Sequence, residues 1–186
     1  MSSLSGFLVS SLPLLRLGEK PFYPSAAFLE QCRPHLTPAE FAVLAEVTIE
    51  PGRVSGSWTD RKWQEFDVYL RNRVAVSRAN RDDTDAAPWL RHEDDVFPSL
   101  QRVIEESMTV ADPIQRERLL DELRWGRLDD LTVGHEADFE ALINYRLRLL
   151  LAEKWAVPDP EPGRRVLAAL VDAAVAQAQE RRQESE

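Results

Sequence analysis

One segment near the C-terminal end restricts the possible folds more than any other part of this sequence. Residues 136–155 are predicted to form a helix whose apolar side chains cover most of its circumference: Phe139, Leu142, Ile143, Tyr145, Leu147, Leu149, Leu150 and Leu151. A helix that is apolar nearly all round offers no face to solvent and belongs at the centre of a bundle. The chain is therefore expected to pack further helices around this one.

Capping signals and apolar spacing divide the rest of the chain into those helices. Thr37, Pro38 and Glu40 combine a capping hydroxyl, a proline at the first helical position and a carboxylate three residues after the cap. Asp112 and Pro113 repeat the cap and the proline. Besides residues 136–155, helices are predicted over residues 25–34, 37–47, 58–81, 98–108, 112–131 and 164–179, after a short irregular or extended lead-in over residues 4–17.

The predicted fold class is all-α, a bundle of six or seven helices. Only seven glycines occur in 186 residues, whereas a sandwich or barrel needs many tight turns. Gly126 is expected to interrupt or bend its helix. Residues 1–156 are predicted to form the bundle, with a candidate hinge at residues 82–88. Residues 157–163 are predicted to be a proline-rich spacer, and residues 164–186 a C-terminal helix and charged tail.

Charge and motif content argue against two classes of ligand. The formal net charge is −9, and contact with phosphates needs a basic surface, so the chain is not expected to bind nucleic acid. The phosphate-cradling pattern Gly-x-x-x-x-Gly-Lys-Ser/Thr and the dinucleotide pattern Gly-x-Gly-x-x-Gly are absent from the sequence. No nucleotide is therefore expected to bind.

Catalysis and metal binding are not expected either. The histidines His35, His92 and His135 lack the spacing of metal-binding pairs, and the acids beside His92 and His135 suit exposed helix starts. Cys32 lies on the same predicted helix face as Phe28, which favours a core residue over a nucleophile. The chain is predicted not to be an enzyme and to use no metal and no cofactor.

Cysteine content and hydropathy predict where the protein is found. A single cysteine cannot form an internal disulfide, which suits a reducing compartment. The sequence shows no basic and apolar leader of the signal-peptide kind, and no run of about 18 apolar residues of the kind a membrane-spanning helix requires. A cytoplasmic protein without direct membrane insertion is predicted. It is expected to reach the inner face of the cell membrane only through a complex.

Five side chains are candidate contacts with a partner protein. Trp89 and Trp125 lie among charged residues, and tryptophan and arginine dominate interface hot spots. Arg71 and Arg78, on one side of the helix over residues 58–81, form a basic ridge suited to an acidic partner. Alternatively, these two arginines pair with acids of residues 82–140 or complement the helix dipole. Arg146 lies within the apolar arc of residues 136–155, so it either pairs with an internal carboxylate or faces a partner.

Charge is also distributed unevenly along the chain. Residues 58–81 contain six basic and three acidic side chains, whereas residues 82–140 contain seventeen acidic and six basic ones. Two interpretations remain open. The protein docks onto partners of two different characters, or the two parts of the bundle pair with each other.

Several segments together resemble a known group of sequences. They are residues 11–19 (SLPLLRLGE), 28–32 (FLEQC), 65–73 (EFDVYLRNR), 123–129 (LRWGRLD) and 139–145 (FEALINY), the last continuing to Trp155. Through them the chain resembles an uncharacterised bacterial family whose genes lie among those for subunits of V-type rotary ATPases. The similarity extends over nearly the whole chain.

The resemblance implies a non-catalytic component or accessory of a V-type ATPase, and so a link to hydrogen ion transport. One such role is that of the helical stalk subunit, which seats the central stalk on the membrane rotor ring. V-type ATPase subunits are then the expected partners. The alternative is a free-standing cytosolic adaptor or regulator whose helical bundle binds another protein through an acidic face.

Overall fold

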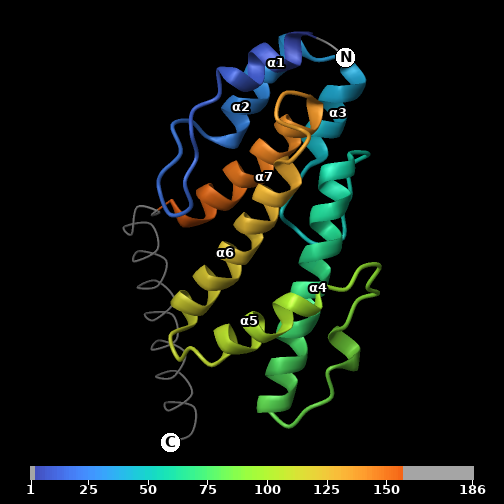
Figure 1. Ribbon diagram of the computed structural model, residues 1–186, viewed down its shortest axis with the longest axis vertical. Helices are drawn as coiled ribbons and strands as arrows, with labels where there is room; N and C mark the ends of the chain where they lie inside the picture. The colour runs from blue at the N-terminus through green and yellow to red at the C-terminus, as the bar shows by residue number, and fades with distance from the viewer. Residues whose placement is uncertain (1–2, 157–186) are drawn as a thin grey trace, which may run out of the picture. The chain divides into compact units, whose positions relative to one another are not determined.

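A computed structural model describes residues 3–156 and confirms the all-helical prediction (Figure 1). Over this range the chain forms seven α-helices, two short 3₁₀ helices and no strand. They are α1 (Ser3–Ser10), α2 (Ser25–Cys32), η1 (Arg33–His35), α3 (Pro38–Glu46), α4 (Trp58–Arg81), η2 (Ala87–Trp89), α5 (Pro98–Met108), α6 (Pro113–Thr132) and α7 (Phe139–Trp155). The predicted spacer at residues 157–163 and the predicted helix and tail at residues 164–186 lie outside the described residues.

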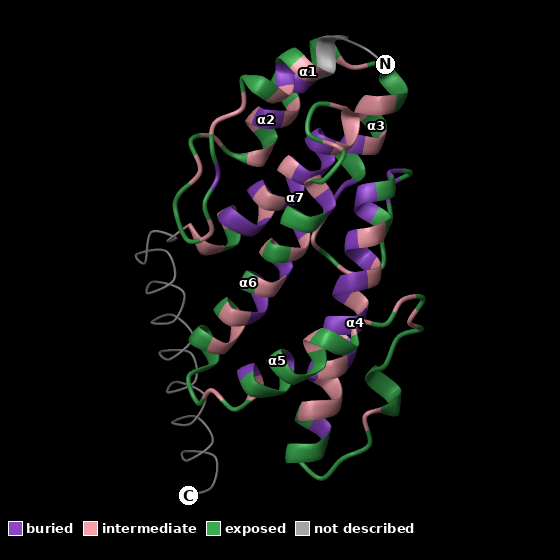
Figure 2. Ribbon diagram, viewed as in Figure 1, coloured by how far each residue is buried: buried purple, intermediate pink, exposed green. Residues whose placement is uncertain are grey.

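Helix α7 lies at the centre of these helices, as its apolar circumference predicts. It packs against α1, α2, α3, α4 and α6. Four of its side chains, Leu142, Ile143, Leu147 and Leu149, have no exposed surface, and the buried residues along α7 and α4 appear in purple in Figure 2. Trp63 of α4 and Phe28 of α2 belong to the same apolar cluster.

A second apolar cluster lies between α4, α5 and α6. The aromatic side chains Phe66 and Tyr69 of α4 meet Ile104 of α5 and Leu120 of α6, and all four are buried. Phe97, directly before α5, packs edge-on against both α4 rings, at centroid distances of 5.3 and 5.4 Å. The long helix α4 therefore contributes to both clusters and joins them.

The helix starts that were predicted from local signals are confirmed. Thr37 and Glu40 form a full capping box at the start of α3, and the Asp112 side chain accepts a hydrogen bond from the Ile114 N–H at 2.9 Å at the start of α6. Two further caps come from α7. The Glu153 carboxylate accepts from the Ser25 N–H of α2 at 2.6 Å, and the Glu140 carboxylate caps α4.

Three details differ from the predictions. The lead-in is irregular only from Ser11 onward, because residues 3–10 form α1, whose Leu8 is buried in the cluster around α7. Ser25, expected as an N-cap, is the first residue of α2, with Pro24 in the capping position. Helix α6 continues through Gly126 without interruption. The hinge at residues 82–88 stays a prediction.

Candidate protein-binding surface

The segment that follows α4, residues 82–96, returns along the side of that helix. Asn72 of α4 is almost fully buried, and its side-chain amide pairs with both backbone groups of Arg91. Nδ2 donates to the Arg91 carbonyl at 2.7 Å, and Oδ1 accepts from the Arg91 N–H at 2.9 Å. This pairing imitates the bonding between two backbones, so it fixes the returning segment at one residue.

Two ion pairs hold the same segment further along α4. Arg73 Nη2 donates to Glu93 at 2.6 Å, and Lys62 Nζ donates to Asp95 at 3.0 Å. Hydrogen bonds to Glu65 and Asp95 raise the pKa of Lys62, and the Lys62 ammonium lowers the pKa of Asp95. Two basic residues of 58–81 therefore pair with acids of 82–140, which supports the internal-pairing interpretation for these residues.

Two hollows of about 290 Å³ each lie along this line, on either side of the Asn72–Arg91 pairing in the sequence of α4. The first is lined by Ala75, Arg78, Ala79, Asp82, Thr84 and Trp89. The second is lined by Gly52, Val54, Arg61, Gln64, Glu65, Val68, His92 and Asp94. We call the two hollows, together with Arg71 between them, the α4 surface.

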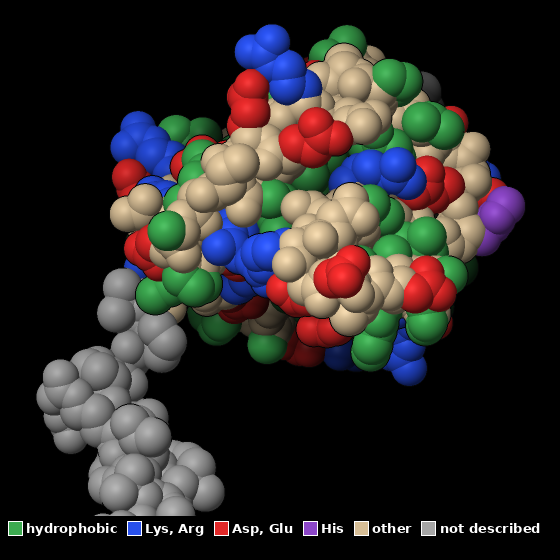
Figure 3. Space-filling model, turned by 90° about the horizontal axis from the view of Figure 1, so that it is seen from below, with side chains coloured by type: hydrophobic (Ala, Val, Ile, Leu, Met, Phe, Trp, Pro, Cys, Tyr) green, Lys and Arg blue, Asp and Glu red, His purple; other side chains and the backbone are tan. Residues whose placement is uncertain are grey.

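Large apolar side chains are exposed on the α4 surface. Trp89 is 75% exposed in the first hollow, and Val54 is 54% exposed in the second. Figure 3, which views the molecule from below Figure 1, shows basic and acidic side chains interspersed with apolar ones. Such a mixture of exposed apolar and charged groups is typical of surfaces that bind proteins.

Three of the five predicted contact residues lie on the α4 surface. Arg78 and Trp89 line the same hollow although they come from different elements. Arg71 falls between Val68 and Ala75 at helical spacing, on the side of α4 that lines both hollows. Its Nε donates to the buried Asp67, yet its side chain stays 41% exposed. Arg71 therefore serves the fold as well as any partner.

The other two predicted contacts lie elsewhere. Trp125 is partly buried against the cluster around α7, and the Arg148 guanidinium lies 5.2 Å from its ring centroid. Arg146 is buried and donates to the carbonyls of Val47 and Ser25 at 3.2 and 3.4 Å. Both expectations for Arg146 are thus corrected. Backbone carbonyls, and neither a carboxylate nor a partner, satisfy its guanidinium, and its burial lowers its pKa.

A buried charged cluster between α4 and α6 was not predicted. Arg124 donates to Asp67 at 2.7 Å and to Asp121 at 2.6 Å, and both carboxylates are fully buried. Burial lowers the pKa of Arg124, but the two carboxylates outweigh it and raise that pKa overall. At the end of α7, Lys154 and Trp155 both donate to Asp121 at 2.7 Å. The only sequence signal is the three-residue spacing of Asp121 and Arg124.

The described residues limit the chemistry that this part of the chain offers. Between residues 3 and 156, no group of three histidine, cysteine, aspartate or glutamate side chains is placed to hold a metal ion. Cys32 is fully buried, and burial raises its thiol pKa to about 11, so the thiol stays protonated at neutral pH. Within the same range, no helix is both long and apolar enough to span a bilayer.

The chain matches one protein family. The model of the family described as "Protein of unknown function (DUF2764)" matches residues 62–177, which is more than half of the sequence and includes most of α4 and all of α5, α6 and α7. No curated protein and no solved structure matches the chain.

Proposed function

The chain belongs to the DUF2764 family, and we propose that it works by binding other proteins, as a non-catalytic component or accessory of a V-type ATPase. One observation carries the binding role: Trp89, 75% exposed, lines one hollow of the α4 surface together with Arg78. The V-type ATPase is proposed because segments across the chain resemble a family encoded beside its subunits. A coupling role between the central stalk and the membrane rotor is the specific form of this proposal.

Trp89 supports protein binding because of what its exposure costs. A large aromatic ring that lies in water loses the favourable transfer of its apolar surface, which a contact with a partner would restore. The segment that carries Trp89 is tied to α4 through Asn72, Arg73 and Lys62. The ring is thus presented from a fixed position, which lowers the entropy lost on binding.

The charges around Trp89 favour an acidic partner surface. Arg78 is exposed, and no described carboxylate forms an ion pair with it. Arg71 adds a second, half-exposed guanidinium on the same side of α4. A partner that offers carboxylates around an apolar pocket for the indole ring would match both groups. The complex would then lie at the cytoplasmic face of the membrane without any insertion of this chain.

A pull-down from native membranes tests the proposal. The tagged full-length protein should recover V-type ATPase subunits, and Trp89→Ala or Arg78→Glu should lower that recovery by roughly tenfold or more. Arg78 is a cleaner probe than Arg71, because Arg71 also pairs with Asp67. Recovery should weaken as salt rises, since exposed charges are screened.

Matched controls separate the α4 surface from general effects. Phe22→Ala removes an aromatic ring that is 88% exposed outside both hollows, and Arg102→Glu reverses an arginine that is 85% exposed on α5. Neither control should change recovery. If folded wild-type protein recovers no V-type subunit, the ATPase proposal fails. If the controls act as strongly as the α4 variants, the α4 surface is the wrong site.

A further inference from the structure

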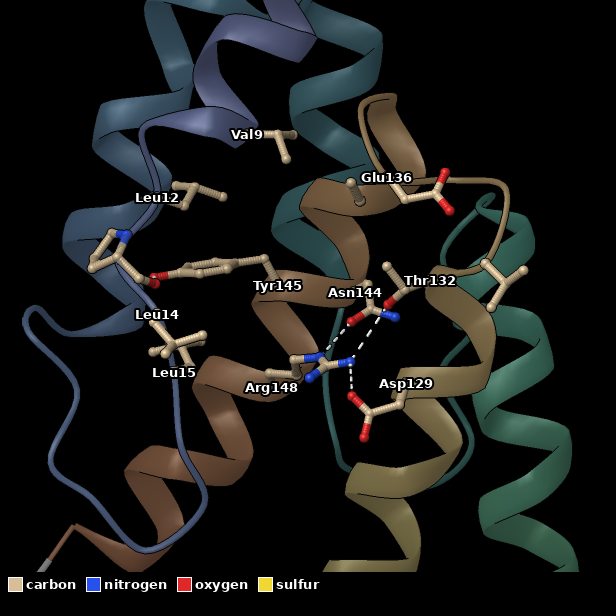
Figure 4. Close-up of a pocket in the computed structure, with 13 residues that line it drawn as sticks. Val9, Leu12, Leu14, Leu15, Asp129, Thr132, Glu136, Asn144, Tyr145 and Arg148 are labelled. Carbon is tan, nitrogen blue, oxygen red and sulfur yellow. Dashed lines mark hydrogen bonds and ion pairs between the residues drawn. The ribbon is translucent and has the colours of Figure 1, made fainter.

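A groove of about 520 Å³ lies between the N-terminal segment and the pair of helices α6 and α7 (Figure 4). One wall is the segment from Val9 to Leu15, and the other is the end of α6 with the loop that follows it. Helix α7 forms the floor with Ala141, Tyr145 and Arg148. These three floor residues follow helical spacing, so the groove extends along about 10 Å of α7, at roughly 1.5 Å per residue.

The polar groups of the floor are already bonded to one another. Arg148 donates to Asn144 through Nε and to Asp129 through Nη2, both at 2.7 Å. Tyr145 donates to the Pro13 carbonyl at 3.0 Å, which ties the N-terminal wall to α7. The groove is therefore held open by its own contacts, and its polar floor has little need of a polar ligand.

The upper part of the groove is apolar and exposed. Leu14 on one wall is 81% exposed, and Val133 on the other is 76% exposed. Large aliphatic side chains exposed on both walls favour an occupant that covers the rim as well as the floor. A small molecule seated on the floor would leave both side chains in water.

The charge at the groove is acidic. Glu136 is exposed, and Asp129 is 62% exposed. Arg148 is the one basic residue of the lining, it is 18% exposed, and Asp129 already neutralises it. An occupant with basic groups beside an apolar face matches this arrangement.

We propose that this groove binds an amphipathic helix of a partner protein, with aliphatic side chains along one face and lysine or arginine on its flanks. Its aliphatic residues would lie between Leu14 and Val133, one helical turn apart over the α7 floor. Its basic flank would meet Glu136 and the outer oxygen of Asp129. This inference does not rest on the proposed ATPase role, because the groove shares no residue with the α4 surface.

The test is isothermal titration of the full-length protein with two designed helical peptides. Both carry leucines at three- and four-residue spacing; one has lysine flanks and the other glutamate flanks. The lysine-flanked peptide should bind saturably and roughly tenfold or more tighter than the glutamate-flanked peptide, with an advantage that shrinks as salt rises. If the lysine-flanked peptide gives no saturable binding, or if both peptides bind equally, the proposal is overturned.

Variants locate the site. Leu14→Asp and Val133→Asp should each weaken the lysine-flanked peptide by roughly tenfold or more, and Glu136→Lys should remove its salt dependence. Phe22→Asp makes the same kind of change at a ring that is 88% exposed outside the groove, and it should bind as the wild type does. Circular dichroism confirms that each variant is folded. Unchanged binding in folded Leu14→Asp and Val133→Asp places the peptide elsewhere and refutes the inference.

Sedimentation distinguishes a second copy of this chain from a partner helix. If the wild type self-associates, Leu14→Asp makes it monomeric and the peptide does not compete, then the groove is a self-association surface and the proposal is wrong. A monomeric wild type that binds the peptide supports it.

Discussion

Removal of the Glu140 carboxylate should destabilise the start of α4 from a distance of more than eighty residues along the chain. Glu140 accepts hydrogen bonds from Ser57 Oγ at 2.6 Å, from the Thr59 N–H at 2.8 Å and from the Trp58 N–H at 3.3 Å. The Trp58 and Thr59 N–H groups belong to the first turn of α4, where no helical carbonyl reaches them. Glu140→Ala leaves both without an acceptor.

The expected cost follows from these bonds. Loss of an N-cap costs about 1 kcal/mol, and a hydrogen bond to a charged group contributes about 1.5–3 kcal/mol. Because Glu140 is partly exposed and water replaces some of the lost bonding, we expect Glu140→Ala to lower the free energy of unfolding by about 2–3 kcal/mol. Glu140→Gln keeps one acceptor oxygen and should cost about 1 kcal/mol.

The pH dependence gives a second, independent measurement. Burial opposes the charged form of Glu140, but the hydrogen bonds from Ser57, Thr59 and Trp58 outweigh it and lower the pKa of Glu140. The stabilisation is thus fully present above the unfolded pKa of about 4.3 and is lost as pH falls through the folded pKa. The difference between wild type and Glu140→Gln should be largest at neutral pH and should shrink below about pH 4.

Urea denaturation followed by circular dichroism at several pH values is the assay. Glu122→Ala is a matched control, because Glu122 is 53% exposed and its nearest basic partner, Arg118, lies 3.7 Å away; it should change stability by less than about 0.5 kcal/mol. A cost for Glu140→Ala no larger than that of the control would refute the capping role. A pH-independent difference for Glu140→Gln would refute the electrostatic part of the reasoning.

Three further changes test the interior. Leu147→Ala should cost about 2–5 kcal/mol in urea denaturation, because the residue has no exposed surface on the central helix; a melting temperature equal to that of the parent would contradict the central place of α7. Arg124→Met should cost about 3–5 kcal/mol, since it leaves the carboxylates of Asp67 and Asp121 buried without their cation, and a neutral effect would show that this cluster adds no stability. Burial raises the pKa of Asp60, so its favourable contribution is present below the unfolded pKa of about 3.9 and is lost as pH rises through the folded pKa. Asp60→Asn should therefore melt higher than the wild type at pH 7 and lose that advantage in acid; a lower melting temperature at pH 7 would contradict this.

The sequence predicted what depends on neighbouring residues. The Thr37 and Asp112 caps use side chains and backbone groups within three residues of each other, so their pattern is visible in the chain. The central place of α7 follows from its apolar circumference, which needs no knowledge of its neighbours. These features led to the correct class and to six of the seven described α-helices.

What the sequence did not predict depends on residues far apart in the chain. Helix α1 forms where Leu8 meets the cluster around α7, and Arg146 finds carbonyls that are 99 and 121 residues away. The return of residues 82–96 depends on Asn72, whose amide shows no preference for Arg91 in the sequence. Arg78 and Trp89 could be named as candidates, but their shared hollow exists only once that return is made.

The two caps that α7 supplies have a consequence for the order of folding. Glu140 and Glu153 complete the first turns of α4 and α2, yet they are synthesised long after those helices leave the ribosome. During translation α2 and α4 therefore remain without their final caps and without the central helix that covers their apolar faces. Native contacts of such long sequence separation slow folding. The first half of the chain should thus stay open to chaperones and proteases until residue 153 has emerged, and only then should it close as one unit.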